Sequence, residues 1–166
     1  MKTRLTEVIP RLKIPAAAAG GFADGRGLAA ALVMGADGVQ IGTVFLCSEE
    51  CEIHINAKNK ILASQSTDVV VTGSVRKRTN ATRGIRNAFS DKFHMLEDSG
   101  ASLQELSDLA TGTNRKAFVD GDVQNGFVMS GQGITVVKEI RTCKDIIVSI
   151  NSEAEDILKR APSLIR

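Results

Sequence analysis

The sequence predicts an α/β protein, and three observations support this fold class. Short apolar segments that end in glycine alternate with segments of helical spacing in the first third of the chain. Two of these apolar segments, Ile14–Ala19 and Gly38–Gly42, are separated by one helical segment, which is the order of a βαβ unit. The composition, 43% hydrophobic and 24% charged over 166 residues, is that of a globular domain with one sizeable core.

The first elements predicted are a helix and a buried strand. Thr3–Leu12 has apolar residues at helical spacing, interrupted by Pro10. Ile14–Ala19 is a short apolar segment stopped by Gly20 and Gly21, which predicts a strand buried on both faces of a parallel sheet.

A helix and a second strand complete the βαβ unit. Asp24 is a suitable cap for a helix over Gly27–Met34, whose end Gly35 marks. Gly38–Gly42 returns as another short strand. Strands joined by such a helix run parallel, with a right-handed crossover.

The rest of the chain reads as helices and loops. From Ser48 the spacing is helical, Val69–Val71 is a small β-like run, and the organisation changes after Gly73. A basic stretch runs from Arg76 to Lys92, and a helix is predicted to begin at Ser102 with a capping box to Glu105. Turns are predicted at Asp120-Gly121 and Asn125-Gly126, followed by a loop over Phe127–Gly133. A last helix is predicted from near Thr142, with one apolar face formed by Ile146, Ile147, Ile150, Ile157 and Leu158.

Two glycine-rich bends are the candidate functional site. Ala19–Gly27 and Gly38–Thr43 each join a strand end to a helix start, where unpaired backbone N–H groups and the helix dipole favour an anion. Glycine lets ligand oxygens approach the amides, and it permits positive φ. Two such bends from adjacent strands predict one phosphate site, as after the last two strands of TIM barrels. The alternative is that these glycines only end strands.

These bends carry a resemblance to a known family. Ile14–Leu32 and Gly35–Thr43 resemble the FMN-phosphate region of the enoyl-ACP reductase II and nitronate monooxygenase family of FMN-dependent oxidoreductases. Gly121–Gln132 resembles the C-terminal segment of the enoyl-ACP reductase branch. The resemblance implies the C-terminal portion of a TIM (β/α)8 barrel, with residues 1–73 as a partial barrel that carries the FMN-phosphate site and residues 74–166 as a mainly helical C-terminal extension with a basic segment and a loop.

The resemblance also assigns candidate roles to single residues. It implies that the FMN phosphate is bound by Gly20, Gly21, Gly42 and Thr43, that Gln40 lies close to the flavin, and that Gly131 and Gln132 pack near the mouth of the active site. Two departures from the family pattern are Val44, where a basic residue is usual, and Ala16–Ala18, which replaces bulkier strand residues.

The activity implied is NAD(P)H-dependent enoyl-ACP reduction in fatty acid synthesis, by hydride transfer through FMN to an enoyl thioester. The alternatives are nitronate monooxygenase activity and a non-catalytic, truncated flavin- or phosphate-binding fragment. The family's catalytic histidine is expected upstream of the first helix, and neither His54 nor His94 occupies that motif, so the catalytic residues are unknown. With about two of the eight strands present, we expect the isolated chain to bind flavin weakly and to be inactive.

Other interpretations have less support in the sequence. Cys47, Cys51 and His54 would fall on consecutive turns of a helix, but no fourth zinc ligand is evident, so we predict no metal site. Another phosphate-binding barrel, such as a relative of IMP dehydrogenase, would need a nucleophilic cysteine loop. The Arg76–Arg86 cluster could contact phosphates of a cofactor or of nucleic acid.

Composition restricts the partners. The net charge is +2 and the chain has no tryptophan or tyrosine, which disfavours nucleic acid as a partner. Three cysteines without a disulfide framework, and the absence of a long apolar segment, predict a cytoplasmic protein that does not bind membranes. We expect a small-molecule or acyl-carrier-linked substrate and a homo-oligomer.

Overall fold

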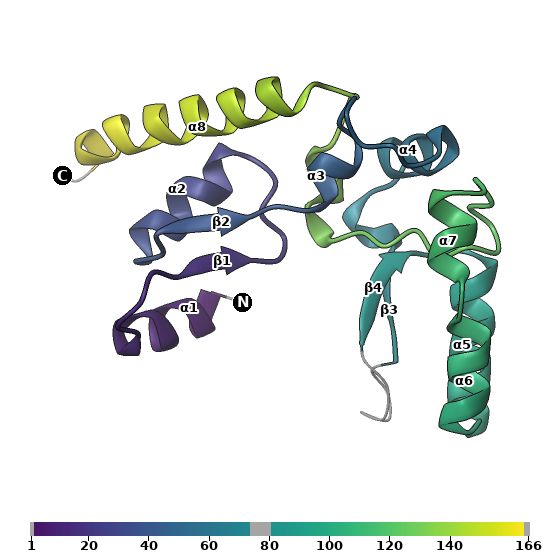
Figure 1. Ribbon diagram of the computed structural model, residues 1–166. Helices are drawn as coiled ribbons and strands as arrows, with labels where there is room; N and C mark the ends of the chain where they lie inside the picture. The colour runs from purple at the N-terminus through teal and green to yellow at the C-terminus, as the bar shows by residue number, and fades with distance from the viewer. Residues whose placement is uncertain (1, 74–80, 165–166) are drawn as a thin grey trace.

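The computed structural model describes residues 2–73 and 81–164, which form two groups of elements along one chain (Figure 1). One group contains α1, β1, α2, β2 and the long helix α8, and the other contains α4 to α7 with a β-hairpin. The elements are α1 (Lys2–Val8), η1 (Ile9–Arg11), β1 (Ala17–Ala19), α2 (Gly25–Val33), β2 (Gly38–Gln40), α3 (Thr43–Leu46), α4 (Ile55–Leu62), η2 (Ser66–Asp68), β3 (Val69–Thr72), β4 (Thr82–Ile85), α5 (Ala88–Ser99), α6 (Leu103–Ala110), α7 (Thr113–Phe118), η3 (Gln132–Val136), α8 (Cys143–Arg160) and η4 (Ala161–Leu164).

The predicted βαβ unit is confirmed. β1 and β2 are parallel, with Ala17 opposite Gly38 and Ala19 opposite Gln40. Asp24 caps α2 as expected, because its Oδ1 accepts a hydrogen bond from the Gly27 amide at 2.9 Å. The two strands therefore end side by side, at the same edge of the sheet.

Only one face of this small sheet is covered. Ala18 is buried and packs with Val39 in a cluster built around α2 and the N-terminal helix. On the other face Ala17, Ala19 and Gln40 are exposed. The expectation of a strand buried on both faces is therefore wrong for the described residues, because the sheet has only two strands. In a TIM barrel the face turned away from the helices is the barrel interior.

Strands β3 and β4 form an antiparallel hairpin that lies outside the parallel sheet. Residue 73 falls between these strands, and Arg76, Lys77 and Arg78 lie outside the described residues. Neither β4 nor α5 nor α7 is predicted from the sequence. β4 begins within the basic stretch, where alternating burial is not visible in the residue types, and α7 is only six residues long.

The second group of elements has two apolar clusters. One joins Cys47, Ile61, Ile85, Val128 and Ile134 across α4, the hairpin and η3. The other is aromatic: the Phe89 ring centroid lies 5.2 Å from that of Phe127 and 6.0 Å from that of Phe93, in tilted arrangements. The capping box predicted at Ser102 and Glu105 is present at the start of α6.

Helix α4 begins at Ile55, so the helix expected from Ser48 starts too early. Residues 47–50 instead run beside residues 141–143, where Ser48 and Arg141 form a parallel β-bridge. The Glu50 carboxylate accepts the Cys143 amide at the start of α8, with 2.9 Å to each oxygen. These contacts between residues 47–50 and 141–143 fix the point at which α8 begins.

Helix α8 packs across α2, the helix of the βαβ unit (Figure 1). Its buried face is Ile146, Ile150 and Ala154, residues four apart, whereas Ile147 is 50% exposed, so the placement of Ile147 on the packed face is wrong. Glu153 Oε2 accepts the Gly25 amide at 2.7 Å and so caps α2 from 128 residues away. None of the helices in the described part of the chain is both long and apolar enough to cross a membrane.

We expect Glu153→Ala to lower the free energy of unfolding by about 1 kcal/mol, because a carboxylate acceptor at a helix N-terminus contributes about that much. Urea unfolding at neutral pH measures it. Glu155→Ala, two residues along the same helix, is the matched control because Glu155 pairs with Lys159 on the surface and does not cap α2. Equal effects of the two substitutions would contradict the capping role of Glu153.

Glu50 makes a pH-dependent contribution to the stability of the fold. Its hydrogen bond from the Cys143 amide is the main reason that the pKa of Glu50 is lowered from its ordinary value of 4.5. The stabilisation is therefore complete above about pH 4.5 and is lost as the pH falls through the lowered value in the folded protein. We expect Glu50→Gln to reduce the loss of stability as the pH falls from neutral to below the lowered pKa of Glu50, measured by urea unfolding. An unchanged pH dependence would show that this bond is not formed.

Candidate functional site

The two predicted bends lie at one edge of the parallel sheet. Gly20 and Gly21 follow β1 with φ of 93° and 83°, a left-handed backbone that favours glycine. Gly42 follows β2, and a Cβ built on it would meet nothing within 4 Å. Because Ala19 is opposite Gln40, both bends leave the sheet at the same level. The bends therefore offer exposed backbone on neighbouring strands, with open space beside Gly42.

A third segment, Gly131–Gly133, contacts both bends. The Gly131 amide donates to Thr43 Oγ1 at 2.9 Å. Gly133 lies so close to the first bend that a Cβ on it would be 3.2 Å from the Gly21 carbonyl oxygen. Gln132 is held between these two contacts and is exposed. The Gly131–Thr43 bond spans 88 positions and the Gly133–Gly21 approach spans 112, so distant parts of the sequence are brought to one place.

The hairpin and the core position this third segment. The Ile85 amide donates to the Val128 carbonyl at 2.9 Å, and the Ser130 amide donates to the Arg83 carbonyl at 3.2 Å. Beyond Gln132, the side chain of Ile134 is fully buried in the larger apolar cluster. The family resemblance predicts that this loop lies near the site, but the residue types do not predict the strand β4 that directs it there.

The start of α2 is already occupied by carboxylates of the protein itself. Asp24 accepts the Gly27 amide and Glu153 accepts the Gly25 amide. Arg26 bonds Asp24 at 2.6 and 2.8 Å, and this hydrogen-bonded pair raises the pKa of Arg26. The expectation that these helix amides are unpaired is therefore wrong for Gly25 and Gly27. An anion at this edge would depend on the bends and on Thr43.

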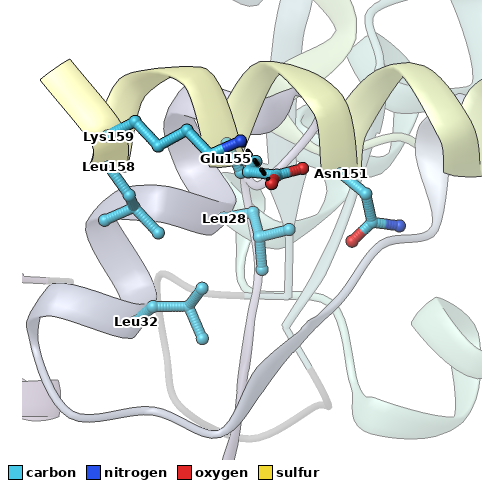
Figure 2. Close-up of a pocket in the computed structure, with 7 residues that line it drawn as sticks. Leu28, Leu32, Asn151, Glu155, Leu158 and Lys159 are labelled. Atoms are coloured by element: carbon cyan, nitrogen blue, oxygen red, sulfur yellow. Dashed lines mark ion pairs between the residues drawn. The ribbon is translucent and has the colours of Figure 1, made fainter.

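Hollows of different character lie near the sheet and α2. A cavity of about 430 Å³ is lined by Ala23, Val44 and charged side chains that include Arg141, next to the bends. A groove of about 530 Å³ is lined by α2 and α8, with apolar side chains from Leu28, Leu32 and Leu158 (Figure 2). The groove is lined by α2 and α8 and not by the bends, whereas the cavity is lined by Ala23 and Val44, which follow the two bends closely.

The histidines and cysteines have structural environments. His54 caps α4 by accepting the Asn56 amide, and His94 Nε2 lies 3.0 Å from the Val71 carbonyl oxygen, as expected for a structural histidine. Cys47 is buried, and desolvation raises its pKa to about 11. Cys47 ends α3 and His54 precedes α4, so the consecutive helical turns required by the zinc interpretation do not exist. Within the described residues, no group of three or more His, Cys, Asp or Glu side chains could hold a metal ion.

The geometry fits a flavin phosphate. Such a group needs glycine bends that let oxygens approach backbone amides, together with a hydroxyl donor, and it needs room. Gly20, Gly21 and Gly42 are exposed, the space beside Gly42 is open, and Thr43 supplies the hydroxyl. Gln40 is exposed on the sheet face opposite α2, so it lies on the side that faces the interior of a barrel.

The fold defines a class: part of a parallel α/β barrel with paired glycine bends at the C-terminal ends of its strands. Residues 2–153 match the family model described as nitronate monooxygenase, and the chain belongs to this family of oxidoreductases. The sequence-based resemblance and the predicted α/β fold class are thereby confirmed.

Individual relatives agree with the family assignment. The chain is 33% identical over 154 residues to a probable nitronate monooxygenase of Staphylococcus saprophyticus. The aligned region covers 93% of this chain and 42% of the relative. A second relative is the (3aS,4S,5R,7aS)-5-hydroxy-7a-methyl-1-oxo-octahydro-1H-indene-4-carboxyl-CoA dehydrogenase of Rhodococcus jostii. The chain is 31% identical to it, and the aligned region covers 96% of this chain and 54% of the relative.

Solved structures show the same architecture. The structure of FabK from Thermotoga maritima superposes with a TM-score of 0.92 at 35% identity, covering 99% of this chain and 51% of that one. The chain thus spans about half the length of the relatives it matches.

The two bends differ in what an added methyl group would do. We expect Gly21→Ala to lower the free energy of unfolding by about 1 kcal/mol or more, because its φ of 83° is unfavourable for alanine. Gly42→Ala, at φ of −111° beside open space, should change it by less than about 0.5 kcal/mol. Urea unfolding of both variants measures this difference, and a destabilised Gly42→Ala would mean that the space beside Gly42 is filled.

Proposed function

We propose that this chain binds the phosphate of FMN between its two bends, as part of an FMN-dependent oxidoreductase. The observation that carries the proposal is that one segment, Gly131–Gly133, contacts both bends, so the two strand ends converge. A single phosphate can then accept hydrogen bonds from both sides. The family assignment supports this use of the site.

In this proposal each residue has a separate role. Backbone at Gly20, Gly21 and Gly42 approaches the phosphate oxygens without a side chain in between. The Thr43 hydroxyl donates to the phosphate, while Gln40 lies beside the flavin ring and Gln132 near the mouth of the site. When bound, FMN supplies a ring that accepts a hydride from a nicotinamide and passes it to an acceptor.

The proposed activity is NAD(P)H-dependent reduction of an enoyl thioester, as in enoyl-ACP reductase II, for which FabK is the name. Two findings favour a thioester substrate: the high similarity to the FabK structure, and a relative whose name describes a carboxyl-CoA substrate. The resemblance of Gly121–Gln132 to the reductase branch agrees with it. The second candidate is nitronate monooxygenase, which the family description and the staphylococcal relative favour.

We further propose that the isolated chain binds FMN weakly and has no turnover, so that by itself it behaves as a non-catalytic flavin-binding fragment. Ala17 and Ala19 are exposed on the face where a complete barrel would have its interior. No catalytic histidine is proposed, since His54 and His94 are engaged in structural hydrogen bonds. Three free cysteines are consistent with a cytoplasmic protein.

Self-association is the remaining part of the proposal. A groove of about 400 Å³ beside β2 is lined by apolar side chains that include Leu28, Leu32 and Phe45, and among the described residues β2 is paired along one edge, with β1. An unpaired strand edge next to apolar surface favours pairing with a second copy of the chain. Size-exclusion chromatography with light scattering should give a homo-oligomer, and a monomer at all concentrations would contradict this.

FMN titration followed by fluorescence tests the site. We expect saturable binding by the wild-type chain, and a roughly tenfold or greater loss of affinity in Gly42→Ala, because the new Cβ would block a charge-assisted hydrogen bond. Gly38→Ala is the matched control, since a Cβ there also meets nothing within 4 Å but lies at the other end of β2. Equal affinity of the two variants, or no binding by the wild type, would refute the site.

Activity assays separate the candidate reactions. We expect the purified chain with FMN to show neither NAD(P)H oxidation with a crotonyl thioester nor consumption of a nitronate. Turnover of the thioester by the chain alone would identify an enoyl reductase and refute the proposed inactivity. Turnover of the nitronate alone would favour the second candidate instead.

A further inference from the structure

We infer that Thr43 couples occupancy of the phosphate position to the placement of the Gly131–Val136 segment. The inference rests on the proposed function and goes beyond it, because it concerns what a bound phosphate does to the rest of the site. Thr43 is then a positioning residue for Gln132, in addition to its contact with phosphate. The observation behind it is the hydrogen bond from the Gly131 amide to Thr43 Oγ1, at 2.9 Å.

The chemistry of the hydroxyl makes the coupling possible. A threonine hydroxyl has one proton to donate and two lone pairs that accept. Gly131 uses a lone pair, so the proton remains for an anionic oxygen. Hydrogen bonds in such a chain polarise one another, so a phosphate that accepts from Thr43 strengthens the bond that Thr43 accepts from Gly131.

The two ends of the segment are held differently. At the far end, Ile134 is fully buried and Thr135 Oγ1 accepts the Ser66 amide at 2.8 Å, so that end belongs to the core. At the near end, Gly131 is tied to Thr43, and Gly133 rests against the Gly21 carbonyl. A change at the phosphate position therefore acts on the near end, where Gln132 lies.

The consequence is that binding of the cofactor phosphate is linked to the ordering of the segment around Gln132. Phosphate binding would order the backbone on both sides of Gln132, and an ordered segment would in turn raise the affinity for phosphate, because linkage between two equilibria is reciprocal. A flavin without phosphate would leave the segment unchanged.

Hydrogen exchange of residues 129–137 tests the inference in the wild-type chain, with FMN and with riboflavin, which lacks the phosphate. With FMN at about ten times its Kd, we expect exchange in the segment to slow by roughly tenfold. Riboflavin and the free chain should exchange alike. This comparison needs no variant, so it does not depend on whether a substitution folds.

Three variants separate coupling from simple stabilisation. Thr43→Val can neither accept nor donate, so it should lose the FMN-dependent slowing and bind FMN roughly tenfold more weakly. Thr43→Ser keeps the hydroxyl and should restore both. Thr135→Val is the matched control, because it removes a similar hydrogen bond, from the Ser66 amide to the Thr135 hydroxyl, at the end of the segment distant from Thr43. It should retain the FMN-dependent slowing.

The outcomes distinguish the inference from the proposed function. If the wild-type chain binds FMN but exchange in the segment is unchanged, or if Thr43→Val and wild type respond equally, the coupling is refuted and the phosphate site stands. If riboflavin slows exchange as FMN does, the coupling is refuted because the ring alone would be responsible. If FMN does not bind to the wild-type chain, both are refuted.

Discussion

The parallel pairing of β1 with β2 is the constraint on which the candidate site depends. Because Ala19 lies opposite Gln40, the chain leaves both strands at the same level and the two glycine bends become neighbours. A shift of register would move one bend along the strand direction by 3.3 Å per residue, on the order of the length of a hydrogen bond. The small residues of these strands allow α2 to lie close behind them, where Ala18 and Ala31 are almost completely buried.

The bends do not form the site without a segment from much later in the chain. Gly131 reaches Thr43, and it is directed there by the hairpin through the bonds that Val128 and Ser130 make with β4. The excursion between α3 and α8 is therefore more than an appendage. It supplies Gly131–Gly133, which contacts both bends, and the elements that hold this segment have no part in the parallel sheet.

Local chemistry explains which features the sequence could predict. The βαβ unit, the Asp24 cap and the Ser102 capping box each depend on residues within a few positions of one another, and all three are present. The exposure of Ile147 and the occupation of the Gly25 amide by Glu153 depend on partners far along the chain, whereas β4 pairs with the neighbouring strand β3. For these features the residue types alone carry no signal, since β4 contains Arg83 and Gly84 and reads as a loop.

The carboxylate that Glu153 provides to Gly25 has a consequence for biosynthesis. The acceptor and the amide are 128 residues apart, so during translation α2 emerges long before its partner exists. Contacts of such separation slow folding, because a long loop must close before they form. The cap that Glu153 places on α2 therefore forms only after α8 has been synthesised, 128 residues later than the helix start that it caps.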